Sequence, residues 1–182
     1  MPRPNTYARL YELAEGQDGY FSSYQAEEAA VPRMTLLRAT DAGVLKRTSR
    51  GVYRLTHFPV ISNNAHFWEA VLWPQVRKPY LGTLSHYTAL QLHELSDVNP
   101  ETTHITVPMT LRSGRRTLPP LLVVHRADIE SYDTTHVDGL PVTTVERTLL
   151  DIAQMNDPVA LTDALRDARA RRLPIPRELA HG

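Results

Sequence analysis

The sequence predicts an α+β protein with a helical N-terminal domain and a small mixed α/β C-terminal domain. Apolar residues recur at helical spacing through most of the first 43 residues, and residues 44–55 then alternate in polarity across a turn, which is typical of a β-hairpin. Beyond residue 64, short apolar runs with strand composition alternate with helical segments. A chain of 182 residues with 42% hydrophobic residues can form one ordinary domain or two small ones. The change in pattern favours two, at 1–57 and 65–182, joined by a polar linker at 58–64.

Four elements of the N-terminal region follow in the order helix, helix, helix and hairpin, with a turn expected at 17–21. Ser22 or Ser23 is a suitable N-cap for the second helix, because its hydroxyl can accept a backbone N–H. Pro32 suits the first turn of the third helix, and Gly43 suits its end. This order of elements indicates a winged helix-turn-helix. We expect the elements at 7–16, 22–30, 32–43 and 44–55.

The C-terminal region is predicted to mix helices and short strands. Thr143 or Thr144 can cap one helix, and Asp157 can cap the last one, with Pro158 in its first turn. Helices are expected at 66–73, 83–95, 144–155 and 157–172. Strands are expected at 104–109, 121–126 and 135–144.

The formal net charge is zero, but the charges are segregated along the chain. Residues 31–57 contain six Lys and Arg residues against the single Asp41, and residues 102–127 contain four Arg and no acid. Residues 128–167 reverse the sign, with nine Asp and Glu against two Arg. This asymmetry favours surfaces for different partners, although solvated faces alone can also carry it.

The basic segment predicts a DNA-binding site. In a helix-turn-helix the second helix lies in the major groove, and its exposed side chains read base edges. The cations of the hairpin, or wing, are expected to contact phosphates and to add affinity that depends on salt. The base-reading candidates are Arg33, Met34, Thr35 and Arg38. The backbone-contacting candidates are Lys46, Arg47, Ser49 and Arg50.

A second basic stretch, residues 111–120, is predicted to be an exposed loop. It is a candidate for additional DNA contacts, for RNA contacts, or for a simple solvated surface. Its candidate residues are Arg112, Arg115 and Arg116.

Residues 10–55 resemble the N-terminal domain of the AbiEi family of antitoxins from type IV toxin–antitoxin systems. The resemblance rests on "GYF" before the second helix, on the pattern Val-x-Arg-x-x-Leu that begins the third, and on "GVLKR…RGVYRL" over the hairpin. Further segments are similar to the C-terminal part of the same family, so that the resemblance extends over roughly residues 7–155. These segments are "SHYTALQLHELSDVNPETTHITVP", "LVVHRADI" and "DGLPVTTVERTLLDIA".

The resemblance implies a bacterial transcriptional repressor of its own toxin–antitoxin operon. The N-terminal domain would bind operator DNA upstream of that operon, using the recognition-helix and wing residues named above. The C-terminal domain would oppose a nucleotidyltransferase-like toxin, typically without a stable complex. Repressors of this kind often bind paired half-sites as homodimers.

Catalysis and metal binding are not supported by the sequence. His86 and His93 are seven residues apart and lack the spacing of helical zinc ligands. Ser85 and His86 are neighbours, and neighbours on a helix do not face each other. A metal-dependent nuclease needs converging carboxylates and often a lysine, and Lys78 is the one lysine of the C-terminal region.

One stretch nevertheless remains a candidate for a divalent ion, although solvated surface is the preferred interpretation. It comprises His125, Asp128, Asp133, His136 and Asp138. No cofactor is predicted. Two alternatives to the repressor stay open: a protein-docking adaptor built on the winged helix, and a degenerate nuclease.

The sequence also predicts the compartment. The absence of cysteine excludes a disulfide framework, and the polar N-terminus lacks the apolar core of a signal peptide. No segment has the roughly 20 apolar residues of a membrane span. We therefore expect a cytoplasmic protein.

Overall fold

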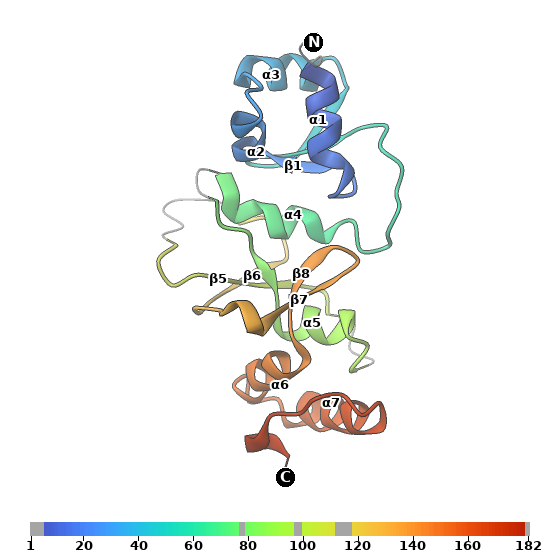
Figure 1. Cartoon of the computed structure of the whole chain (residues 1–182), viewed down its shortest axis with the longest axis vertical. Coiled ribbons are helices and arrows are strands. Elements are labelled where there is room, and N and C mark those ends of the chain that lie inside the picture. The colour runs from blue at the N-terminus through green and yellow to red at the C-terminus, as the bar shows by residue number, and fades with distance from the viewer. Residues whose placement is uncertain (1–5, 77–78, 97–99, 112–117, 181–182) are drawn as a thin grey trace. The chain divides into compact units, whose positions relative to one another are not determined.

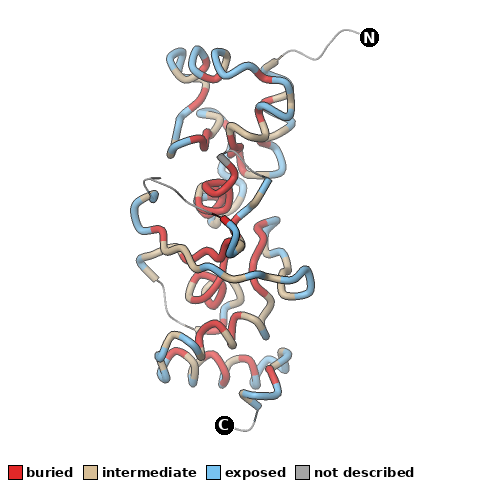
Figure 2. The backbone as a smooth tube through the Cα atoms, turned by 90° about the vertical axis from the view of Figure 1, so that its left-hand side faces the viewer, coloured by how far each residue is buried: buried red, intermediate tan, exposed pale blue. Residues whose placement is uncertain are grey.

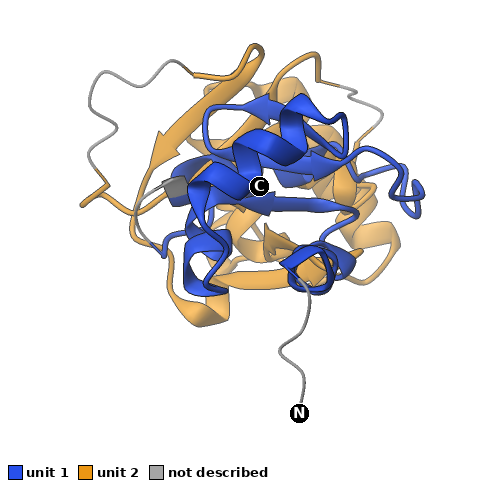
Figure 3. Cartoon of the chain, turned by 90° about the horizontal axis from the view of Figure 1, so that it is seen from above, with its two compact units in different colours: residues 1–82 blue, residues 83–182 orange. Residues whose placement is uncertain are grey.

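The chain contains helices and two separate β-sheets, so the protein has the mixed α/β structure that the sequence predicted (Figure 1). The computed structural model describes residues 6–76, 79–96, 100–111 and 118–180. The chain divides into two units, which are described separately below. These are unit 1, Met1–Gly82, and unit 2, Thr83–Gly182 (Figure 3).

The first part of unit 1 contains three helices that pack on a three-stranded antiparallel sheet. The strand order is β1-β3-β2, so β3 is the central strand and pairs with both β1 and β2. Strands β2 and β3 form a hairpin. The helices are α1 (Thr6–Glu15), α2 (Ser23–Glu28) and α3 (Arg33–Asp41). The strands are β1 (Tyr20–Ser22), β2 (Leu45–Ser49) and β3 (Val52–Leu55).

Local sequence signals explain where these helices start. Ser22 is the N-cap of α2, accepting the Gln25 backbone N–H, and the Gln25 side chain accepts the Ser22 N–H in return, which completes a capping box. Pro32 is the N-cap residue of α3, and no side chain caps that end of the helix. The apolar core of unit 1 comprises Leu10, Ala14, Phe21, Ala26, Val31, Leu36, Ala39, Leu45 and Tyr53.

Unit 1 continues past the predicted linker. Helix α4 (Phe67–Leu72) is buried at five of its six positions, whereas residues 59–61 and Asn63 are exposed (Figure 2). The 3₁₀ helix η1 (Trp73–Val76) contacts α2 and β1, and the Ser22 hydroxyl donates a 2.9 Å hydrogen bond to Gln75 Oε1. The structural boundary therefore follows Gly82, later than the linker expected at 58–64.

Unit 2 consists of a five-stranded mixed sheet and three α-helices that pack in successive layers. Strand β4 forms its centre, antiparallel to β5 and parallel to β8, in the order β6-β5-β4-β8-β7. Helix α5 packs on the sheet, α6 on α5, and α7 on α6. The strands are β4 (Thr83–Leu84), β5 (Thr103–Val107), β6 (Leu122–Arg126), β7 (Thr134–Val137) and β8 (Leu140–Thr143). The helices are α5 (His86–Leu92), α6 (Val145–Ala153), α7 (Pro158–Ala170) and the 3₁₀ helices η2 (Ser131–Asp133) and η3 (Arg177–Leu179).

Three of the predicted elements are corrected by the structure. Tyr20 and Phe21, expected in a turn, and Ser22, expected to begin the second helix, form β1 because they pair with β3 across the sheet. The single strand expected at 135–144 is a hairpin of two strands, β7 and β8. The helix expected at 83–95 begins only at His86, because Thr83 and Leu84 pair with β5 and β8. Capping by Thr144 and Asp157 is confirmed, since they accept the N–H groups of Arg147 and Ala160.

Candidate nucleic-acid interface

One face of α3 is fixed in the core and the other is open to solvent. Leu36 and Ala39 are buried at 2% and 0% relative exposure, and they anchor the helix to unit 1. The Thr40 hydroxyl donates to the Leu36 carbonyl, while the Thr35 side chain is half-buried. The exposed residues of α3 include Arg33, Met34, Leu37 and Arg38. A basic helix face that also carries two apolar side chains can contact both phosphates and thymine methyl groups.

The β2–β3 hairpin presents three exposed cations, Lys46, Arg47 and Arg50. The register shifts between Arg47 and Ser49, which is a bulge that bends the strand near its end. Gly51 has a φ of +80°, a conformation that glycine adopts without a steric penalty, and it allows the chain to reverse beside Arg50.

Ser49 differs from the other wing candidates. Its hydroxyl oxygen is buried and, among the described residues, has no hydrogen-bond partner, and the same is true of Thr48. A phosphate contact from Ser49 would therefore require a change of rotamer.

A groove of about 660 Å³ separates the start of α3 from the hairpin. Three arginines line it, and the carboxylate of Glu27 on α2 is the acidic group among its lining residues. The other lining residues are Ser23, Ala30, Val31, Pro32, Leu36, Leu37, Gly51 and Tyr53. Of the predicted DNA-contacting residues, the groove brings together Arg33, Arg47 and Arg50.

The remaining DNA-contacting candidates lie elsewhere. Met34, Thr35, Arg38 and Lys46 are on α3 or β2 but do not line the groove. Arg112, Arg115 and Arg116 lie outside the residues that the structure describes, as does Lys78.

Other arginines of unit 1 are held by the fold itself. The Arg9 guanidinium donates to the carbonyls of Ala29 and Ala30, at 3.3 and 3.4 Å, and so caps the end of α2. Arg54 lies over the Tyr20 ring at 5.4 Å from its centroid and donates to the Phe58 carbonyl. These two arginines stabilise local structure.

The cations of α3 and the hairpin have few such contacts. Within the described residues, Arg33, Arg38, Lys46 and Arg50 form no ion pair and no side-chain hydrogen bond, and Arg47 donates only to the nearby Ser49 carbonyl at 3.3 Å. Exposed and unpaired cations at one site are available to an external anion.

Glu27 and Tyr53 line this groove but were not predicted from the sequence as site residues. Glu27 and Arg33 are six residues apart, on different helices, and only the turn through Val31 and Pro32 brings both to the groove. The available sequence signal was the short α2–α3 connection, which keeps the end of one helix near the start of the next.

Unit 2 contains a second cluster of functional groups, formed by three histidines. The His86 and His125 rings stack at 3.5 Å between centroids, and His104 Nδ1 lies 2.9 Å from His125 Nε2. His86 Nδ1 is also 2.9 Å from the Ser85 hydroxyl, which accepts a hydrogen bond from Thr106.

The short Ser85–His86 distance corrects the expectation that these neighbours do not face each other. Ser85 is not in the helix: it has extended backbone angles, and His86 has a φ of +52°, which turns the two side chains together. The Ser85 side chain is fully buried at 0% exposure, so the pair is part of the polar interior of unit 2.

Burial determines the charge state of this cluster. Desolvation is the main cause that lowers the pKa of His86 to about 3, with further contributions from His125, His104 and Arg147. Burial likewise lowers the pKa of His104 to about 4 and that of His125 in the same direction. The three rings are therefore neutral near pH 7.

Asp151 lies beside the histidine cluster in a buried ion pair. Its Oδ1 accepts a 2.9 Å hydrogen bond from Arg147, which also contacts Asp133 at 3.0 Å. Its Oδ2 is buried without a hydrogen-bond partner, 3.9 Å from His86 Nδ1. Desolvation raises the pKa of Asp151, and the Arg147 contact opposes this shift.

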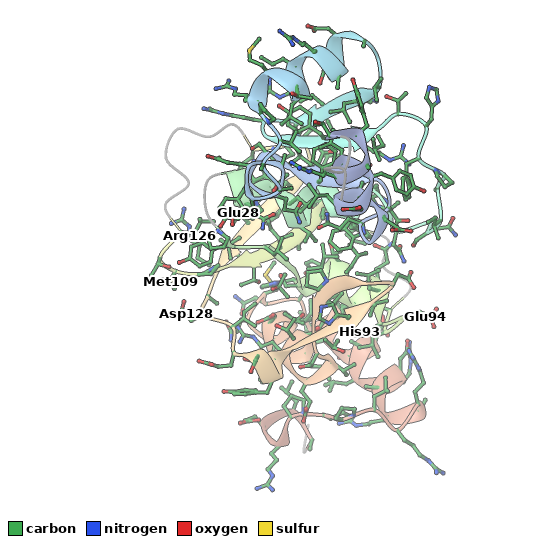
Figure 4. The ribbon with its side chains drawn as sticks, turned by 45° about the horizontal axis from the view of Figure 1, so that its top comes forward. Glu28, His93, Glu94, Met109, Arg126 and Asp128 are labelled. Carbon is green, nitrogen blue, oxygen red and sulfur yellow. The ribbon has the colours of Figure 1, made fainter. Side chains whose placement is uncertain are left out.

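The candidate divalent-ion stretch is dispersed in the structure. His125 contacts His104, Asp133 pairs with Arg147, and Asp128 accepts the Met109 backbone N–H at 3.2 Å (Figure 4). Across the described ranges, no three His, Asp or Glu residues are arranged so that they could hold a metal ion.

Comparison with known proteins supports the N-terminal resemblance. Residues 8–56 match the sequence model of the AbiEi antitoxin family of transcriptional regulators, which confirms the resemblance over less than a third of the chain. None of the curated proteins matches this chain. In the part of the chain that the structure describes, no helix has the length and apolar character of a bilayer span.

Proposed function

We propose that residues 6–55 form a winged helix-turn-helix and that the protein is a sequence-specific transcriptional repressor. Helix α3 enters the major groove of operator DNA upstream of the protein's own operon, and the β2–β3 hairpin contacts the DNA backbone. The observation that carries this proposal is the set of exposed cations on α3 and the hairpin that have no ion-pair partner among the described residues. The match of the same segment to a family of transcriptional regulators supports it.

The proposal extends to the partner of the system. The protein acts without catalysis as the antitoxin of a type IV pair, and unit 2 opposes a nucleotidyltransferase-like toxin. The family match supports this role only through residues 8–56, so the role of unit 2 needs a separate test. Co-expression of this protein with the neighbouring toxin gene should restore the growth of cells that the toxin alone inhibits. A chain lacking unit 2 should still repress transcription but should not restore growth. Equal rescue by the chain lacking unit 2 would exclude unit 2 as the antitoxin part.

DNA binding is tested by fluorescence anisotropy. Labelled DNA from the region upstream of the gene is compared with a scrambled duplex of the same composition at three salt concentrations. We expect submicromolar binding that prefers the upstream DNA and weakens steeply with salt, because each neutralised phosphate releases about 0.9 counterions. Weak and equal binding to both duplexes would contradict the repressor and favour a protein-docking role for unit 1. Cleavage of either duplex with magnesium or manganese would instead favour a nuclease.

The stoichiometry on DNA is measured with the same duplexes. Binding as a homodimer predicts paired half-sites about 10 base pairs apart, since a two-fold protein presents two copies of α3. Analytical ultracentrifugation of the complex should then give two chains for each operator.

A further inference from the structure

The groove between α3 and the hairpin combines three arginines with one carboxylate, and none of the four forms an ion pair with a described residue. Like charges that line one groove repel one another, and the Coulomb energy of such a group is lowered when an anion enters. The volume of about 660 Å³ lies within the range of about 300–1,000 Å³ that is typical of ligand-binding clefts.

The position of Arg33 decides between two roles for this residue. From the sequence, Arg33 is grouped with Arg38 as a base reader. In the structure, Arg33 is the first residue of α3 and lines the groove with Arg47 and Arg50, whereas Arg38 does not line it. Arg33 thus belongs spatially with the hairpin cations, which are expected to contact the backbone.

The start of α3 adds to the attraction for an anion. Helix α3 has nine residues, and no side chain caps its N-terminus, where Pro32 occupies the N-cap position. The first backbone N–H groups of α3 and the positive end of its helix dipole therefore lie at the end of the helix that carries Arg33.

We propose that this groove binds one DNA phosphate segment between Arg33, Arg47 and Arg50, and that Glu27 limits its affinity. Arg33 is then a backbone-contacting residue, and base reading falls to Arg38 with Met34 and Thr35. The Glu27 carboxylate repels any phosphate in the groove, whatever the base sequence, and so suppresses binding to random DNA. This inference rests on the proposed DNA-binding function, and it assigns which side chains of that surface supply affinity and which supply specificity.

The test compares single variants on the upstream and scrambled duplexes by anisotropy. Arg33→Ala should weaken binding to both duplexes by the same factor, about tenfold, and reduce the salt slope by about 0.9. Arg50→Ala should behave in the same way. Arg38→Ala should weaken binding to the upstream duplex more than to the scrambled one, by a factor of about ten or more. Arg33→Lys should recover part of the affinity, because it restores the charge.

Glu27→Gln provides the opposite prediction. Removing the carboxylate should raise affinity for both duplexes, by about fivefold at low salt, and the gain should shrink as salt increases. The matched control is Glu28→Gln, because Glu28 is the neighbouring exposed carboxylate on α2 (Figure 4) and does not line the groove. The Glu28→Gln variant should show a smaller gain than Glu27→Gln.

The outcomes separate this inference from the repressor proposal. Selective wild-type binding combined with an Arg33→Ala loss confined to the upstream duplex would overturn the groove assignment and leave the repressor intact. Weak unselective binding with equal losses would support the groove and contradict the repressor. No binding of wild-type protein to either duplex would overturn both. Circular dichroism of each variant verifies that the fold is retained.

Discussion

The two units use their charged residues in different ways. Four arginine–carboxylate ion pairs join described side chains, and all four lie in unit 2. In unit 1, by contrast, a set of exposed cations on α3 and the hairpin forms no ion pair with a described residue: Arg33, Arg38, Lys46, Arg47 and Arg50. These cations of unit 1 therefore take no part in stabilising ion pairs with described residues, whereas Arg147 and Arg166 of unit 2 do.

The interiors of the two units also differ in how many polar side chains they bury. The core of unit 1 is formed by aliphatic and aromatic side chains, such as Leu10 and Phe21, which is stacked on Tyr53. The interior of unit 2 contains more polar residues than that of unit 1, where Asp18, Ser22 and Gln75 are buried. The buried polar residues of unit 2 include Ser85, His86, Thr88, His104, Thr106, Thr143, Thr148 and Asp151. An apolar core tolerates changes of solvent pH, whereas a polar interior depends on every hydrogen bond and protonation state within it.

The largest effect that the comparison predicts is on the stability of unit 2. Asp151→Ala should lower the free energy of unfolding by about 3 kcal/mol, because it leaves the partly buried Arg147 with Asp133 as its remaining carboxylate partner. Urea denaturation followed by circular dichroism measures this change.

The control for Asp151→Ala is Asp163→Ala. The Asp163–Arg166 pair is exposed, with 38% and 68% of the two side chains accessible, and its removal should cost less than about 1 kcal/mol. Equal losses in the two variants would contradict a special role for the buried pair.

A smaller effect is expected from acid. The pKa of His86 is about 3 in the folded chain, against 6.5 for a free histidine, so the unfolded chain binds more protons as the pH falls below about 6.5. Stability should therefore be complete above pH 6.5 and decline toward pH 3. His104, with a pKa of about 4, acts in the same direction. For His86 alone, the loss between pH 7 and pH 5 is on the order of 2 kcal/mol.

The variant that tests this pH dependence is His86→Asn. Asparagine tolerates the positive φ at this position. Because asparagine does not titrate, the free energy of unfolding of the variant should change less between pH 7 and pH 5 than that of the wild type. His136→Gln, a change of an exposed histidine on β7, should keep the wild-type slope. An unchanged slope in His86→Asn would show that other groups cause the acid sensitivity.

The smallest expected effect is on the stability of unit 1. Arg38→Ala should change the free energy of unfolding by no more than about 0.5 kcal/mol, because this exposed side chain has no partner among the described residues. Both tryptophans, Trp68 and Trp73, lie in unit 1, so tryptophan fluorescence in urea reports this change. A loss above 1 kcal/mol would mean that Arg38 stabilises the fold, and its effect on DNA binding would need another explanation.

Much of the secondary structure was predictable because its signals are local. Ser22 and Thr144, each one of two candidates from the sequence, and Asp157 cap helices, and Pro158 lies in the first turn of α7. Two of the strands that were not predicted, β1 and β4, have three and two residues. Such short strands carry no alternation of their own, and they exist because distant strands pair with them.

The candidate nucleic-acid interface was predictable only in part, because some of its features also depend on contacts between segments distant in the sequence. The exposed cations of α3 and the hairpin followed from helical spacing and composition. The groove did not, since it depends on how α2, α3 and the hairpin pack in three dimensions. In unit 2, the contact of His86 with Ser85 depends on a positive φ that composition does not reveal.

The central strand β4 has a consequence for how the chain acquires its structure. Leu84 pairs with Val142, so the sheet of unit 2 is incomplete until two segments almost 60 residues apart have met. The sheet of unit 1 closes between Tyr20 and Leu55. Contacts over longer loops form more slowly because closing the loop costs more entropy. We therefore expect unit 1 to fold first as the nascent chain leaves the ribosome, before β8 has been synthesised.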